Sequence, residues 1–596
     1  MRLLRLLRKI LVGLFAVIGA LVFLSGVAGY MASQQFAERE QPLSNRVVLT
    51  LDLSRGIAER SAAGPFAWTE FNQGAIMREL VLALEAAARD DRIKGVAARL
   101  GTGPVGMAQA QEIRDAIKNF RQSGKFALAF AETFGETGDG NIHYYLATAF
   151  DEIWLQPSGD VRMTGFRLES PYFKTALDTV GVTSRIDQRE EFKGAFDPFT
   201  KASMPAPVRD NLQGLVDSWM TQLASGIAEA RQIAPGAARA LIDRGPFLAA
   251  DALGQKLVDK LAYWDEFDGA VGDRAGSDAQ RLSVSRYAAT LAPPPDAAEI
   301  AVVYGVGPVH LSARESDPLF GDFGMGSRSV SKAIRDAVAD PGVKAIIFRV
   351  DSPGGSYVAS DAIWREVERA RLAGKPLIVS MGDVAASGGY FVAAPAQKIV
   401  AQPATITGSI GVLSGKFVLQ ELWRKLEINW EGVQAGANAG IDSTNLDYSA
   451  AEWANLQAGL DRVYGDFTDK VASGRKLPIE RIRAVAKGQI WTGADAREHG
   501  LVDELGGFSV AIRLAREAAG IAIDTPVAVN EYPKVDNSLE GLMGRLLSGE
   551  LFDEVATSEA VATVRLVKML APVAKALAPL LEDRSAQAVR LPELDY

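Results

Sequence analysis

Short apolar runs alternate with amphipathic stretches along most of the chain, a pattern typical of proteins that mix strands and helices. In the second half, runs rich in branched and aromatic residues predict buried strands, namely "IAVVYGVGPV", "VKAIIFRVD", "PLIVSMG" and "KIVAQ". Between them lie stretches with helical spacing, namely "SVSKAIRDAVAD", "SDAIWREVERARLAG" and "KFVLQELWRKL". Strands that alternate with helices predict parallel βαβ units whose helices cover the sheet, and therefore an α/β fold.

The longest apolar segment lies at the N-terminus. Residues 10–32 carry no charge, whereas the preceding segment "MRLLRLLRK" (1–9) is basic. At about 1.5 Å per residue, the uncharged segment spans about 35 Å as a helix, enough to cross a hydrocarbon core of about 30 Å. The basic flank predicts a cytoplasmic N-terminus, with the rest of the chain on the other side of the membrane. A cleaved signal peptide is the alternative, but the run is long for one, so we expect an uncleaved anchor.

The chain after this segment contains two related halves. At an offset of 250 residues, "DDRIKGVAARL" (90–100) matches "DPGVKAIIFRV" (340–350), and "QSGKFALAFAETF" (122–134) matches "LAGKPLIVSMGDV" (372–384). A proline-rich segment, "TLAPPPDAAE" (290–299), has the composition of a linker. We therefore expect an N-terminal repeat over 45–289, a C-terminal repeat over 300–535 and a tail over 536–596.

Composition narrows the kinds of partner and functional site that the chain can have. The 596 residues carry a net charge of −9, and without a basic stripe this balance argues against nucleic acid as a partner. The absence of cysteine excludes disulfides, thiolate metal sites and a cysteine nucleophile. The three histidines, His143, His310 and His499, share no metal-binding motif, so they give little support to a zinc site or a histidine-based triad.

One serine lies at a junction between a predicted strand and a predicted helix, a position that favours a reactive side chain. In "GDVAASGGYFVAAPA" (382–396), Ser387 separates a predicted strand from a predicted helix, where free backbone N–H groups point outward. Ligands of parallel α/β sheets bind beyond the carboxyl ends of the strands, where the glycines of "VDSPGGS" (350–356) can also converge. The alternatives are a tight turn that needs small residues and a phosphate-binding loop. The second is disfavoured because no Gly-Lys-Ser/Thr follows.

Three motifs in this order carry a specific resemblance: "VDSPGGS" (350–356), "GDVAASGGY" (382–390) and "TITGSIGV" (405–412). Together with the tandem halves and the expected anchor, they resemble the long, tandem-repeat bacterial form of signal peptide peptidase A, serine protease family S49. The resemblance covers residues 1 to about 530. It implies two tandem ββα domains of the crotonase/Clp-protease-like fold after an N-terminal transmembrane helix.

The resemblance implies a serine nucleophile activated by a lysine. Ser387 is the serine of the "ASGG" motif. The strand-to-helix turn would expose its hydroxyl, and the helix start would stabilise negative charge close to it. Backbone N–H groups of Gly388, Gly354 and Gly355 are expected to form the oxyanion hole, since glycines allow close approach of the substrate.

The base of the long form lies in a segment that matches "REEFKGAFDPFTKASM" (189–204), which indicates Lys193. Neighbouring aromatic residues predict an apolar setting that favours the neutral amine: Phe192, Phe196 and Phe199. The alternatives are a surface lysine paired with Glu190 or Glu191, and a base elsewhere in the first half, Lys174 or Lys201. By resemblance, Ser409 of "TGSIG" orients the amine, although a serine there can also be a simple turn hydroxyl. The first half has no serine where Ser387 would align, and the second has no lysine matching Lys193, which indicates one composite site.

The resemblance implies a membrane-anchored serine endopeptidase that degrades cleaved signal peptides and other short apolar peptides. We expect an inner-membrane protein with its catalytic part in the periplasm, forming a homo-oligomer, a homotetramer, with closed symmetry and with neither metal nor organic cofactor. Two other classes stay open: a crotonase-like acyl-CoA enzyme and a non-catalytic membrane scaffold. Thioester turnover would favour the first, and failure of an acylating probe to label Ser387 would favour the second.

Overall fold

The computed structural model describes residues 43–60, 75–101, 103–136, 138–291, 293–311, 316–317, 321–322, 324–522 and 524–534. The segments expected as basic flank, transmembrane anchor and C-terminal tail (1–9, 10–32 and 536–596) lie outside the described residues. Within the described ranges, no helix combines the length and the apolar character that a membrane span requires.

The first repeat is built on a six-stranded sheet in which every pair of neighbouring strands is parallel. In spatial order its strands are β11 (Gln280–Ser283), β1 (Val47–Asp52), β4 (Ile93–Leu100), β5 (Phe126–Ala131), β6 (Glu152–Leu155) and β10 (Lys260–Leu261).

The second repeat has the same strand order. Its corresponding strands are β24 (Val527–Tyr532), β12 (Ala298–Val306), β17 (Val343–Ser352), β18 (Leu377–Ala386), β19 (Lys398–Ala401) and β23 (Glu504–Leu505), all paired in parallel. Two short strands extend this sheet beside the end of β18: β20 (Ile406–Gly408) and β22 (Ile490–Thr492). The mixed α/β class with parallel sheets is thus confirmed, and its strand order occurs twice.

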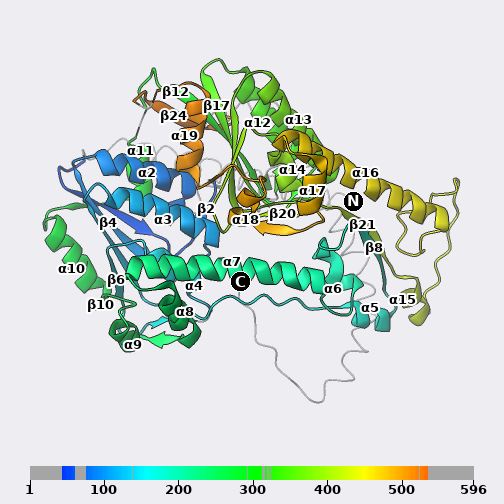
Figure 1. The fold of residues 1–596 in the computed structure, drawn as a ribbon, viewed down its shortest axis with the longest axis horizontal. Helices are drawn as coiled ribbons and strands as arrows, with labels where there is room; N and C mark the ends of the chain where they lie inside the picture. The colour runs from blue at the N-terminus through cyan, green and yellow to red at the C-terminus, as the bar shows by residue number, and fades with distance from the viewer. Residues whose placement is uncertain are drawn as a thin grey trace, which may run out of the picture.

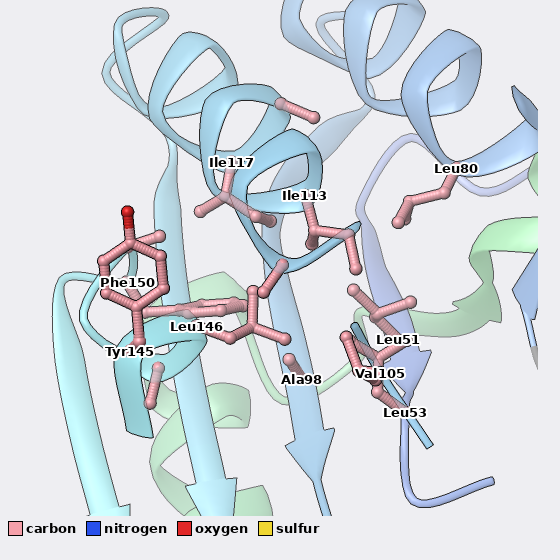
Figure 2. Close-up of a cluster of buried hydrophobic side chains, with 14 of the residues drawn as sticks. Leu51, Leu53, Leu80, Ala98, Val105, Ile113, Ile117, Tyr145, Leu146 and Phe150 are labelled. Carbon is pink, nitrogen blue, oxygen red and sulfur yellow. The ribbon is translucent and has the colours of Figure 1, made fainter. Parts of the chain in front are cut away.

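Helices cover both sheets, as expected for strands that are apolar along their whole length. Figure 2 shows the first repeat, where α2 (Met77–Arg89) and α3 (Met107–Arg121) pack on the strands through side chains such as Leu80 and Ile113. In the second repeat the alternate residues of β12 face two different cores. Ile300 and Val302 belong to a cluster that continues into the first repeat, so one hydrophobic core joins the two halves.

Helices also pack on the sheet of the second repeat, whereas α16 (Ala450–Arg475) reaches away from it (Figure 1). Those on the sheet faces are α12 (Ser327–Ala339), α13 (Tyr357–Leu372), α14 (Gly388–Ala393) and α19 (Phe508–Ala518). Between α14 and α19 in the chain lie α16, α17 (Ile479–Val485) and α18 (Gly493–Glu498). The first repeat adds α4 (Asn141–Ala147), α8 (Pro235–Arg244), α9 (Ala249–Gly254), α10 (Trp264–Ala275) and α11 (Val284–Ala289).

One excursion of the first repeat reaches the second. After β7 (Asp160–Val161) and α5 (Lys174–Val180), strand β8 (Thr183–Gln188) pairs antiparallel with β21 (Leu413–Val418) of the second repeat. The chain then passes through η2 (Gly194–Phe196) and α6 (Asp197–Thr200), and returns along α7 (Ala206–Arg231). The 26 residues of α7 span about 39 Å, and the helix runs along both halves of the molecule (Figure 1).

Polar contacts hold α7 against the second repeat. The Asn211 side chain exchanges two hydrogen bonds with the backbone of Ile490, at 2.8 and 3.0 Å. About two turns farther on, the Trp219 indole donates to the carbonyl of Ala404 at 3.0 Å. The excursion is therefore anchored at both ends of its crossing, by β8 and by α7.

One sequence expectation was wrong in part. The segment 416–426 has helical spacing, but its first residues belong to strand β21, and only Gln420–Lys425 form a short helix, α15. The partner of β21 is β8, which lies in the other repeat. Pairing with a strand so distant in the sequence overrides the local pattern, which contains no sign of that partner.

A buried charge cluster also crosses the interface between the repeats. Arg349 on β17 is 0 % exposed and donates to Glu59 and Glu112 of the first repeat, each at 2.8 Å. It also donates to the hydroxyl of Ser380 at 2.8 Å, and its guanidinium lies 4.6 Å from the centre of the Phe508 ring. A buried cation deprived of its partners is strongly unfavourable, so this cluster specifies how the two repeats fit together.

Candidate active site

Ser387 occupies a sharp turn between β18 and α14. Its backbone has a φ of 54° and a ψ of −118°, a conformation that non-glycine residues seldom adopt. Two hydrogen bonds hold it: the Ser387 N–H donates to the Gly408 carbonyl at 2.9 Å, and the Ser387 carbonyl accepts from Phe391 at 2.9 Å. The expected strand, turn and helix are thus present, and the strained residue is the serine itself.

The glycine loop "VDSPGGS" lies directly against this turn. A Cβ atom on Gly354, whose φ is +98°, would lie 2.5 Å from the Gly388 nitrogen and 2.7 Å from the Ser387 Cβ. Of the three glycines expected to supply N–H groups, Gly354 already donates to Ser352 Oγ at 3.2 Å. Within the described part of the chain, the N–H groups of Gly355 and Gly388 donate no hydrogen bond. These two donors are therefore free to bind an oxygen atom.

Lys193 reaches this turn from the first repeat. Its side chain is buried, with 6 % of the residue exposed, and its Nζ lies 3.0 Å from Ser387 Oγ. The same Nζ donates to the Ser409 hydroxyl at 2.9 Å and to the Ser409 carbonyl at 2.7 Å. The structure thus brings together three residues that lie far apart in the sequence.

The other lysines considered lie elsewhere. Lys174 pairs with Asp178 on α5 at 2.5 Å, and Lys201 is exposed. Glu191, one of the two glutamates considered as a surface partner for Lys193, instead pairs with Lys487 at 3.2 Å.

Burial lowers the pKa of the Lys193 amine to about 8, because the charged form loses its hydration. No carboxylate lies close enough to raise the pKa again. The three oxygen atoms that form hydrogen bonds with the amine, those of the Ser387 hydroxyl, the Ser409 hydroxyl and the Ser409 carbonyl, are all neutral. A protonated amine has three hydrogens for these three acceptors. A neutral amine can donate to Ser409 and accept the hydroxyl proton of Ser387, so the site satisfies both protonation states.

Two glycines of the second repeat enclose Lys193, and no sequence pattern singles them out. A Cβ on Gly411 would lie 3.0 Å from Lys193 Cδ, and a Cβ on Gly488 would lie 2.5 Å from the backbone nitrogen of Lys193 and 2.6 Å from its Cβ. Hydrogen bonds secure the same segments, since Phe192 donates to the Lys487 carbonyl at 3.1 Å. The glycine backbone that approaches Lys193 closely therefore accounts for its burial. From the sequence alone, we expect neighbouring phenylalanines to provide this burial.

Ser409 has a left-handed backbone, with a φ of 49°, and its N–H donates to the carbonyl of Gln489 at 2.7 Å. Beside it lies a cavity of about 560 Å³ whose lining includes Phe192, Asn211, Leu215, Gln489, Ile490 and Trp491. The walls of this cavity come from α7 and β22, and therefore from both repeats.

Two partly buried aspartates, Asp351 and Asp383, lie in the motifs around the serine. Burial, with Glu59 nearby, raises the pKa of Asp351 to about 6. Burial and the neighbouring Asp351 raise the pKa of Asp383 to about 7. Across the described residues, no three acidic or histidine side chains form a group suited to a metal ion.

Comparison with known proteins gives a family match in each half. The model of peptidase family S49 matches residues 119–274 and 369–522. "Protease 4" of Salmonella typhi is 33 % identical over 549 residues, covering 87 % of this chain and 85 % of the relative. "Serine protease SPPA, chloroplastic" of Arabidopsis thaliana is 30 % identical, covering 88 % and 78 %. "Protease 4" of Haemophilus influenzae is 30 % identical, covering 75 % and 74 %.

The enclosure of Lys193 by Gly488 leads to the first prediction. Gly488→Ala should displace Lys193, because the new methyl group would overlap its backbone, whereas Gly124→Ala has a nearly equal φ and nothing within 4 Å. Both variants carry the strain of a left-handed alanine, about 1–2 kcal/mol, but only Gly488→Ala adds overpacking of about 1–3 kcal/mol. Thermal unfolding should show this difference. Acetylation of Lys193, followed by mass spectrometry, should be faster in Gly488→Ala alone; equal rates would contradict the enclosure.

Proposed function

The chain belongs to peptidase family S49, and from this premise we propose that it is a serine endopeptidase with a Ser387–Lys193 dyad. The observation that carries the proposal is the distance of 3.0 Å between Lys193 Nζ and Ser387 Oγ across the two repeats. A base within hydrogen-bonding reach of a hydroxyl can remove its proton as the oxygen attacks a carbonyl carbon.

Lys193 acts as the general base in its neutral form. With a pKa of about 8, about one molecule in ten carries a neutral amine at pH 7, compared with about one in 2,500 for an ordinary lysine. The shift lowers the free energy needed to deprotonate the lysine by about 3 kcal/mol. Ser409, through its hydroxyl and its carbonyl, directs the amine so that the lone pair faces Ser387. The protonated amine then returns the proton to the leaving nitrogen.

The oxyanion of the tetrahedral intermediate is bound by the N–H groups of Gly388 and Gly355. Support for this comes from their lack of other acceptors and from the position of Gly388 at the start of α14. Gly354 acts through its shape, since its own N–H is engaged and any side chain there would collide with the Ser387 turn. The repeated strand order supports a crotonase/Clp-protease-like fold for each repeat.

The proposal extends to location, substrate and assembly. The basic segment 1–9 and the uncharged run 10–32 support an inner-membrane anchor with the catalytic part in the periplasm, where cleaved signal peptides and short apolar peptides would be substrates. Protease added to spheroplasts should digest the body of the protein, and full protection would contradict this topology. We also propose a homotetramer; a fully active monomer in light scattering at micromolar concentration would contradict it.

The dyad is tested by substitution. Ser387→Ala and Lys193→Arg should each abolish peptidase activity, since arginine remains charged, and the double variant should lose little more than either alone. Fluorophosphonate labelling of Ser387, followed by mass spectrometry, should disappear in both. The matched control is Lys201→Arg, which changes an exposed lysine a few residues away and should keep the parent rate. Activity of Lys193→Arg near the parent level would contradict the assignment of the base.

The pH dependence follows from the lowered pKa of Lys193. Because the neutral amine is the active form, kcat/KM should rise about tenfold per pH unit below pH 8 and level off above it. With an ordinary lysine the rise would continue to about pH 10 before levelling off. Initial rates on a fluorogenic apolar peptide between about pH 6 and pH 9.5 measure the profile. A flat profile over this range would contradict a lysine base.

A further inference from the structure

Helix α3 of the first repeat begins without a cap of its own. Its N-cap residue is Gly106, which has no side chain to accept the free N–H groups of the first turn. An acceptor comes from the second repeat instead: Asp383 Oδ1 accepts from the N–H of Ala108 at 2.8 Å and from that of Gln109 at 3.1 Å. A Cβ on Gly106 would lie 1.8 Å from Asp383 Oδ2, so the glycine makes room for the carboxyl group.

Asp383 lies at an irregularity of β18 that points it toward α3. Val350 of β17 pairs with Met381 of β18, and the next pair of residues along the two strands is Ser352 with Ala385. Three residues of β18 (382–384) therefore face the single residue Asp351, whose Oδ1 accepts from the N–H of Val384 at 2.9 Å. Bulges of this kind commonly re-aim a side chain beside an active site.

Beyond the bulge, β18 leads directly into the serine turn. Val384, Ala385 and Ala386 pair in register with β20, and Ser387 then donates to Gly408. Only three residues separate Asp383 from Ser387, and all three are held in this ladder. A shift of Asp383 would therefore be passed along the strand to the serine.

We propose that Asp383 is a positioning residue, which by capping α3 from the opposite repeat fixes the β18 bulge and with it the strained turn of Ser387. The proposal rests on the function proposed above for Ser387. It differs from a purely stabilising cap because it links the contact to the reactivity of the serine.

The surroundings of Asp383 decide which substitution is conservative. The charged groups near it are Asp351, Glu59 and, beyond them, Arg349. Burial and Asp351 raise the pKa of Asp383 to about 7, so at pH 6 the side chain is mostly a neutral acid. Asparagine has the same shape, is also neutral and keeps an oxygen that can accept the two N–H groups.

The test compares variants that remove the cap with one that keeps it, all at pH 6. Asp383→Ala and Gly106→Ala should both slow fluorophosphonate acylation of Ser387 by about tenfold, the size expected for loss of a helix cap, and Asp383→Asn should stay within about twofold of the parent. Gly106→Ala perturbs the same contact from the first repeat. The control is Ser283→Ala, which removes the N-cap of α11 and should leave acylation unchanged.

Amide hydrogen exchange over 384–391 gives a readout that does not depend on catalysis, and it should be faster in Asp383→Ala and Gly106→Ala only. Unchanged exchange and unchanged acylation in both variants would overturn the proposal. A lowered melting temperature with acylation at the parent rate would also overturn it, because a cap that only stabilises the fold gives this result. Absence of acylation in the parent would contradict the catalytic role of Ser387, and exchange alone would then decide the role of Asp383.

Discussion

The burial of the Lys193 amine between two halves of one chain is the constraint on which the proposed chemistry depends, because loss of hydration lowers the pKa of the amine. Lys193 gains its burial from Gly411 and Gly488, which belong to the repeat that also carries Ser387. The excursion through β8 and α7 carries the lysine to this position. Neither repeat alone contains both members of the proposed dyad, because Ser387 and Lys193 come from different repeats.

The interface between the repeats combines a continuous apolar core with a few buried polar contacts. The apolar part supplies most of the driving force for association of the halves, since it removes large surfaces from water. The polar part, formed by Arg349 with its two glutamates and by Asp383 at the start of α3, has strict geometric requirements. Such contacts add little net stability but penalise any other fit of the two halves.

Much of this arrangement can be predicted from the sequence. The repeat, the parallel strands and the turn at Ser387 follow from local patterns, because apolar runs and glycine-flanked serines depend on their own neighbours. The proximity of Lys193 to Ser387 is different. It was expected only through family resemblance and the complementary losses in the two halves, because no spacing rule links residues in separate repeats.

Other features could not be predicted, for physical reasons. The strand at Leu413–Val418 owes its conformation to β8 of the other repeat, and Gly488 matters only because a distant lysine passes over it. Asp383 stands inside a quoted motif, yet its partner is the uncapped start of α3. The missing cap at Gly106 was the signal available in the sequence, but it does not indicate which residue fills the gap.

The path of the excursion has a consequence for the order in which the chain is synthesised. A ribosome releases Lys193 first and Ser387 much later, and Gly488, which closes over the lysine, emerges last of the three. Until then the amine remains hydrated and keeps its proton, so under the proposed mechanism an incomplete chain carries a serine without a base. Under that mechanism the peptidase needs no removable inhibitory segment to stay inactive during its synthesis, because its own unfinished fold prevents the reaction.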